Sequence, residues 1–108
     1  MLSNLKAAIA TGDKMEIKKE IKELANEYSL SVGNILSARS VYNRTASEWA
    51  ELAQEMIESA ERNQVDGKPD RVGVSMSLVY ASWVVRALDK NEECKDLTKE
   101  QQKEADKS

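Results

Sequence analysis

The sequence of 108 residues contains no histidine, a single cysteine and a single proline. Histidine is the commonest general base and metal-binding side chain. Its absence therefore excludes zinc fingers and hydrolases that activate a serine or cysteine through histidine. The lone Cys94 has no disulfide partner in the chain and is expected to be an exposed, unreactive thiol. The sequence also lacks a glycine-rich phosphate-binding loop. We expect a protein that is not an enzyme and that uses no cofactor or metal.

Long hydrophobic runs are missing as well. No segment reaches the roughly 18 uncharged apolar residues that are needed to cross a bilayer. Residues 1–14 lack the apolar core and the basic flank of a signal peptide. We therefore expect a cytoplasmic protein that has no contact with a membrane.

The composition that remains favours helices. Hydrophobic residues make up 41% of the chain and charged residues 32%, and strand-forming residues are not abundant. Phenylalanine is absent, so leucine, isoleucine, valine, alanine and methionine must fill most of the core. A chain of this length forms one domain. We predict an all-α fold, a compact bundle of four to five helices within residues 1–88.

Two helices separated by a short break are predicted within residues 13–42. Asp13 is placed to cap a helix whose apolar residues recur at steps of three and four as far as Tyr28. Ser31 is placed to cap a second helix, which runs toward Tyr42. Residues 13–42 are therefore expected to form a unit like a helix-turn-helix.

A long amphipathic helix is predicted over residues 46–63. Thr45 and Glu48 have the spacing of a capping box, in which each side chain binds a backbone N–H at the start of the helix. At the other end of the chain, residues 89–108 are almost wholly polar. They can bury little surface, and we expect a charged, flexible tail.

Residues 72–88 form the most apolar segment. Apolar residues alternate at its start as in a strand, yet they recur at helical spacing over the whole segment. Its length favours a helix, because most strands have five or six residues. Leu78, Ala81 and Val85 lie off its main stripe, so this helix is expected to be central in the fold or in a subunit interface. The expected interface residues on the main stripe are Val72, Met76, Val79, Tyr80 and Trp83.

The break inside residues 13–42 meets most of the physical demands of a helix-turn-helix. Ala25 is the small residue needed where the two helices cross closely. Ser29 falls where the backbone needs positive φ, a position that favours glycine. Leu30 can hold the turn against the core, and Ile35 can face back onto the first helix.

The segment LANEYSLSVGNILSA, residues 24–38, resembles the DNA-binding motif of lactose-repressor-type regulators. In that motif a Leu-Ala pair precedes the turn, and Ser-Val-Gly-x-Ile/Val opens the recognition helix. The resemblance implies that Asn34 contacts a base edge in the major groove and that Arg39 and Arg44 contact phosphate. The full set of DNA-contacting residues that it implies is Ser31, Val32, Asn34, Ser37, Arg39 and Arg44.

The charge distribution leaves two functions open. Residues 1–45 carry seven basic and five acidic side chains, whereas residues 46–88 have a net charge of −3 and residues 89–108 of −2. The first hypothesis is a DNA-binding protein, either a transcriptional regulator or a phage-type DNA-packaging or regulatory subunit, which forms a homo-oligomer through residues 72–88. The alternative is a non-catalytic acidic module that binds a protein partner, as an adaptor or an enzyme inhibitor.

Overall fold

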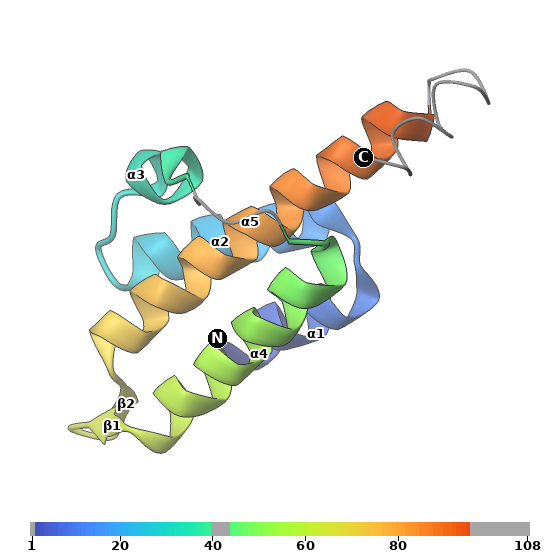
Figure 1. Ribbon diagram of the computed structural model, residues 1–108. Helices are drawn as coiled ribbons and strands as arrows, with labels where there is room; N and C mark the ends of the chain where they lie inside the picture. Colours follow the sequence, from blue (N-terminus) through green and yellow to red (C-terminus); the bar gives the residue numbers. More distant parts are fainter. Residues whose placement is uncertain (1, 40–43, 96–108) are drawn as a thin grey trace.

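The structure confirms the all-α class. The computed structural model describes residues 2–39 and 44–95, with side chains as far as Lys90. Within these residues the chain forms five helices and one short hairpin (Figure 1). None of the described helices is long and apolar enough to cross a membrane. The elements are α1 (Leu2–Thr11), α2 (Lys14–Glu27), α3 (Val32–Ser37), α4 (Ala46–Arg62), β1 (Gln64–Val65), β2 (Lys68–Pro69) and α5 (Arg71–Lys95).

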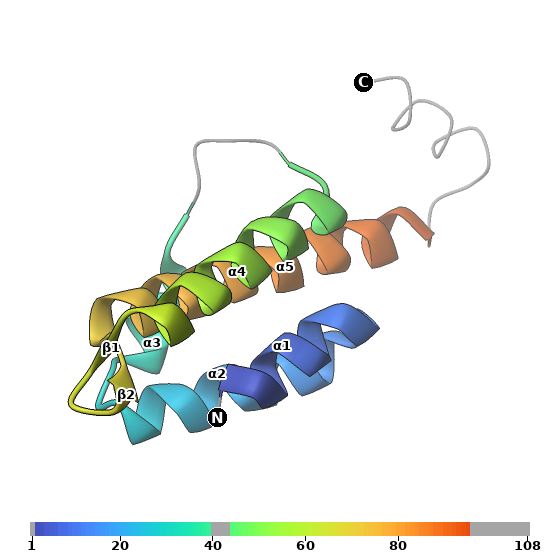
Figure 2. The ribbon, with the colours of Figure 1, turned by 90° about the horizontal axis from the view of Figure 1, so that it is seen from below.

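The long helices form two layers, which Figure 2 shows one above the other. One layer is the α1–α2 hairpin, and the other is the antiparallel pair of α4 and α5. α5 contacts each of the other four helices, and α3 packs against α5 and α2. Fully buried side chains at the centre of the two layers are Leu5, Ile17, Ile21, Leu24, Ala53, Ile57, Val74 and Leu78.

Residues 72–88 are helical as predicted, and the face that enters the core is not the stripe of the expected interface residues. The face of α5 that enters the core contains Leu78, Ala81 and Val85, which the sequence had placed off the main stripe. Val72 and Met76, which were expected to lie on the main stripe, are 68% and 37% exposed. The two stripes have the same spacing of four, three and four residues, so periodicity alone could not distinguish them.

Small side chains explain why this face of α5 is buried. Gly73 lies directly against Ala60 of α4, and an added Cβ at Gly73 would be 2.8 Å from the Ala60 Cβ. Ser77 and Ser82 are also buried, and each hydroxyl donates a hydrogen bond to a carbonyl of its own helix, at 2.7 and 2.6 Å. The absence of a side chain at Gly73 therefore lets α4 approach α5 closely at Ala60.

Two helix ends differ from the prediction. α3 ends at Ser37 rather than near Tyr42, because Ala38 has an extended backbone with φ −60° and ψ 135°. α5 continues to Lys95, so the first seven residues of the predicted tail, 89–95, are helical. The rest of that tail, 96–108, lies outside the described residues.

The connection from α4 to α5 is a tight β-hairpin. Gln64 pairs with Pro69 and Val65 with Lys68 in an antiparallel register. Asp66-Gly67 forms the turn, and both residues have positive φ, 54° and 77°. An Asp-Gly pair suits this geometry because both residues tolerate the left-handed region.

Two ion pairs join the layers at their surface. The Lys6 ammonium of α1 donates to Glu58 of α4, and the Lys14 ammonium of α2 donates to Asp89 of α5, each at 2.9 Å. The hydrogen bond from Lys6, together with its positive charge, lowers the pKa of Glu58. Both pairs are open to solvent, so they contribute little to stability.

The contact between Gly73 and Ala60 makes a prediction about stability. Gly73→Ala is expected to lower the free energy of unfolding by about 1–2 kcal/mol, because overpacking outweighs the gain in helix propensity. The matched control is Gly33→Ala on α3, where the nearest atom to the new Cβ is Ser31 Oγ at 3.9 Å. This variant should gain up to about 1 kcal/mol. Urea denaturation checks both values, and equal stability of the two variants would contradict the close contact.

Candidate nucleic-acid interface

The first helix of the candidate interface, α2, begins as the sequence predicts. Oδ1 of Asp13 accepts hydrogen bonds from the backbone N–H groups of Met15 and Glu16, at 3.0 and 3.4 Å. Its apolar stripe faces α5 and α1, and Ala25 on that stripe is fully buried.

The turn between α2 and α3 depends on an unusual backbone conformation. Ser29 has φ 55°, in the left-handed region that the sequence assigned to this position. The N–H of Leu30 then donates to the carbonyl of Ala25 at 2.7 Å, which closes the end of α2. A non-glycine residue in this region is strained, so other contacts must hold the turn.

Arg71 supplies such a contact from the start of α5. Its guanidinium donates from Nε to the carbonyl of Tyr28 and from Nη2 to the carbonyl of Ser29, each at 3.2 Å. Both carbonyls lie at the C-terminal end of α2, where no residue of that helix can bind them. Partial burial, with a smaller effect from the charge of Glu27, raises the pKa of the Tyr28 hydroxyl.

α3 is held at both ends. Ser31 Oγ accepts a hydrogen bond from the Asn34 N–H at 3.2 Å, and Ile35 is buried against the core. At the C-terminal end, the Arg86 guanidinium donates to the carbonyl of Leu36 at 2.6 Å. The Trp83 indole N–H donates to the carbonyl of Ala38 at 3.1 Å. Side chains of α5 therefore fix a helix of only six residues.

The predicted DNA-contacting residues are mostly exposed. Ser31, Asn34, Ser37 and Arg39 are exposed, and Val32 is half-buried. The Ser37 hydroxyl binds the carbonyl of Asn34 at 3.3 Å. Within the described part of the chain, the side chains of Asn34 and Arg39 have no hydrogen bond or ion pair.

Arg44 is linked to the end of α3 by a chain of contacts through Trp49 and Trp83. Its guanidinium lies over the ring of Trp49, 5.4 Å from the ring centre. The Trp49 ring is 4.7 Å from that of Trp83, which binds Ala38 at the end of α3. Residues 40–43, between Arg39 and Arg44, lie outside the described residues.

The predicted interface residues of α5 divide into two groups. Val72 and Met76 are exposed. Val79, Tyr80 and Trp83 are half-buried. Tyr80 and Trp83 pack within the chain, since their rings lie 5.3 Å apart and both contact Trp49.

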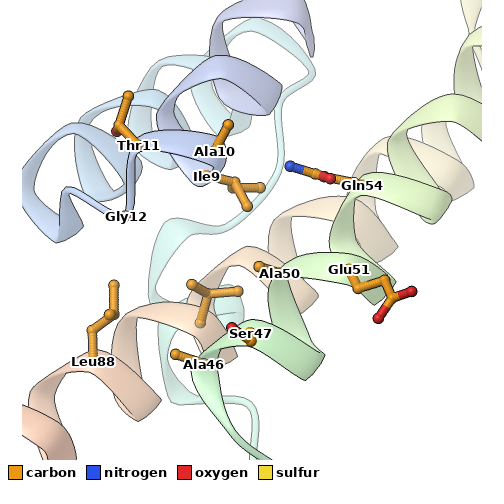
Figure 3. A pocket seen from close by; sticks show the side chains of 11 residues that line it. Ile9, Ala10, Thr11, Gly12, Ala46, Ser47, Ala50, Glu51, Gln54 and Leu88 are labelled. Carbon is orange, nitrogen blue, oxygen red and sulfur yellow. The ribbon is translucent and has the colours of Figure 1, made fainter.

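A pocket of about 350 Å³ lies between α1, α4 and α5 (Figure 3). Ile9, Ala50 and Leu88 are among its apolar lining residues. The side chain of Gln54 points toward α1, whereas the carboxylate of Glu51 points away (Figure 3). The pocket therefore does not bring reactive groups together.

Comparisons with protein-family models, with curated proteins and with solved structures find no match. Among the described residues, no three histidine, cysteine, aspartate or glutamate side chains cluster as a metal site. Sequence reasoning missed the roles of Arg71 and Arg86. Their carbonyl partners are 42 to 50 residues away in the chain, so no local spacing could reveal them.

The strained turn makes a prediction about Ser29. Ser29→Val is expected to lower the free energy of unfolding by about 1–2 kcal/mol, because a β-branched residue fits the left-handed region poorly. Ser29→Gly should be as stable as the wild type or up to about 1 kcal/mol more stable, because relief of strain offsets the greater flexibility of the unfolded chain. Urea denaturation measures both, and a Val variant as stable as the Gly variant would contradict the conformation.

Proposed function

We propose that the protein is a small helix-turn-helix DNA-binding protein that inserts α3 into the major groove. The observation that carries this proposal is the exposure of Asn34 on α3 and of Arg39 just beyond its end, whose side chains have no hydrogen bond or ion pair within the described chain. Such a protein could act as a transcriptional regulator or as a phage-type packaging or regulatory subunit.

Each residue has a distinct role in this proposal. The Asn34 amide can donate and accept at once, which suits the adenine edge in the major groove. Arg39 and Arg44 contact phosphates on either side of that base contact. Ser31 and Ser37 add hydroxyl contacts to the backbone, and Val32 adds an apolar contact. The six residues of α3 span about 9 Å, enough for the start of a recognition helix, where base contacts concentrate.

The charge distribution favours an approach to DNA with the α3 side facing the duplex. The outward face of α4 is acidic, with Glu51, Glu55 and Glu61 exposed. α3 and α4 lie on opposite sides of α5 (Figure 1). Phosphates would repel the α4 face, so the α3 side is the one that DNA approaches. Because few cations meet phosphate, we expect modest affinity and a shallow dependence on salt.

A titration with duplex DNA tests the proposal. A site is first selected from random duplexes, and binding is then measured at several salt concentrations. Wild type should lose affinity as salt rises, with a log–log slope of about −2 for two phosphate contacts per chain. Arg39→Ala should make that slope shallower by about 1 and weaken binding to all sequences alike. Asn34→Ala should lose about 1–3 kcal/mol of preference for one base pair.

The matched control is Arg62→Ala, which removes an exposed arginine from the far end of α4. This variant should bind DNA as wild type does. No binding at low salt, or equal losses in the Arg39 and Arg62 variants, would refute the proposed DNA-contacting face.

A second proposed property is self-association through α5. Val72 and Met76 are large apolar residues one helical turn apart, and both are exposed. They favour a contact with a second copy or with another protein. If the alternative hypothesis of an acidic interaction module holds, the same residues and the acidic side of α4 would meet a basic partner.

Measurement of the molar mass in solution tests self-association. Wild type should be at least a dimer, and the double variant Val72→Lys/Met76→Lys should be a monomer, because two buried charges would destabilise the contact. Met15→Lys is the control, because Met15 on α2 is a methionine that is 67% exposed, about as much as Val72. A wild type that is monomeric at high concentration would refute the interface.

A further inference from the structure

Helix α2 separates its charges into two stripes. Its acidic residues follow one another at steps of four, three and four, which places them on one side of the helix. Two of them, Glu16 and Glu20, line a hollow between α1 and α2, so the acidic stripe lies on the α1 side. The residues of this acidic stripe are Glu16, Glu20, Glu23 and Glu27.

The other stripe is a row of lysines at steps of four residues, formed by Lys14, Lys18 and Lys22. Lys14 shows where the row begins, because its ammonium donates to Asp89 of α5 at 2.9 Å. Lys18 follows one turn later and is half-buried, and Lys22 is exposed. The lysine row therefore starts against α5 and runs out to solvent, on the flank of α2 away from the acidic stripe.

The lysine row works against the stability of α2. Like charges four residues apart repel each other, whereas opposite charges at this spacing would stabilise the helix. The two ion pairs between described residues use Lys6 and Lys14. Within the described chain, the side chains of Lys18 and Lys22 have no hydrogen bond or ion pair. This flank therefore presents two cations that no described acid neutralises, and it attracts anions.

The lysine row lies close to the end of the proposed recognition helix. Arg86 of α5 donates to the carbonyl of Leu36 at the end of α3, at 2.6 Å. Asp89, the partner of Lys14, follows Arg86 by three residues and so lies on the same side of α5. One turn of α5 therefore contacts both the end of α3 and the start of the lysine row. Arg39 lies just beyond the end of α3 and is exposed.

We propose that Lys18 and Lys22 bind phosphates of the DNA strand that lies beside α2 when α3 enters the major groove. This inference rests on the proposed function and adds a second line of contacts to Arg39 and Arg44. The major groove is about 12 Å wide and packed helices lie about 8–10 Å apart, so a helix packed against α3 lies over the edge of the groove. Lysine is a flexible point charge, so both ammoniums can meet phosphates there without a fixed geometry.

The salt dependence of duplex binding tests the lysine row. Arg39 and Arg44 alone give a log–log slope of about −2, and two further contacts should bring the wild type to about −4. Lys18→Gln/Lys22→Gln should return the slope to about −2 and weaken binding to all sequences alike, because phosphate contacts carry no sequence information. The base preference that comes from Asn34 should stay. Lys18→Arg/Lys22→Arg should keep the wild-type slope, because both charges are retained.

The charge-matched control is Lys6→Gln/Arg62→Gln, which removes two cations from α1 and α4. This variant should keep the wild-type slope. Lys22→Glu separates a phosphate contact from a structural role, since a glutamate four residues after Lys18 relieves the repulsion within α2. It should melt no lower than the wild type and yet bind DNA more weakly.

Two outcomes would overturn the lysine contacts. One is a wild-type slope near −2, and the other is an equal loss of affinity in the Lys18→Gln/Lys22→Gln and Lys6→Gln/Arg62→Gln variants. Both outcomes would leave DNA binding through α3 intact. A wild type that binds no duplex at low salt would instead refute the proposed function together with this inference.

Discussion

The close packing of α5 against α4 is the contact on which the other elements depend. At Gly73 the two backbones come so near that a methyl group would meet Ala60 at 2.8 Å. In an interior packed this closely, the position of one helix constrains the positions of the helices that contact it. α5 is therefore fixed against α4 on one side, and it serves as the support for α2 and α3 on the other. A shift of α5 along α4 would therefore displace both α2 and α3.

Side chains of α5 also hold the backbone of the candidate DNA-contacting face in place by hydrogen bonds. Arg71 binds the strained turn, and Trp83 and Arg86 bind the carbonyls at the end of α3. Each such hydrogen bond contributes about 1 kcal/mol net, and more where the donor is charged. A six-residue helix could not be stable by itself. The orientation of Asn34 and Arg39 is thus a consequence of the core, which links the proposed recognition surface to the stability of the fold.

Local signals in the sequence predicted much of this architecture. Caps at Asp13, Ser31 and Thr45 are confirmed, because each depends on residues within four positions. The left-handed conformation at Ser29 is confirmed too, although Arg71 from α5 helps to hold that turn. The all-α class followed from periodicity and composition. The inner stripe of α5 and the length of α3 could not be predicted, because they depend on distant partners. DNA binding and oligomerisation remain predictions.

Sequence alone determined where helices start and where the chain turns, since caps, glycines and short-range hydrogen bonds act within one turn of backbone. Tertiary structure decided which of two equivalent stripes of α5 is buried, because only contact with α4 distinguishes small side chains from large ones. It also decided that Glu20, in a run of charged residues, is buried, with its Oε2 unpaired among the described residues. Such outcomes depend on how whole helices pack, and no local pattern encodes them.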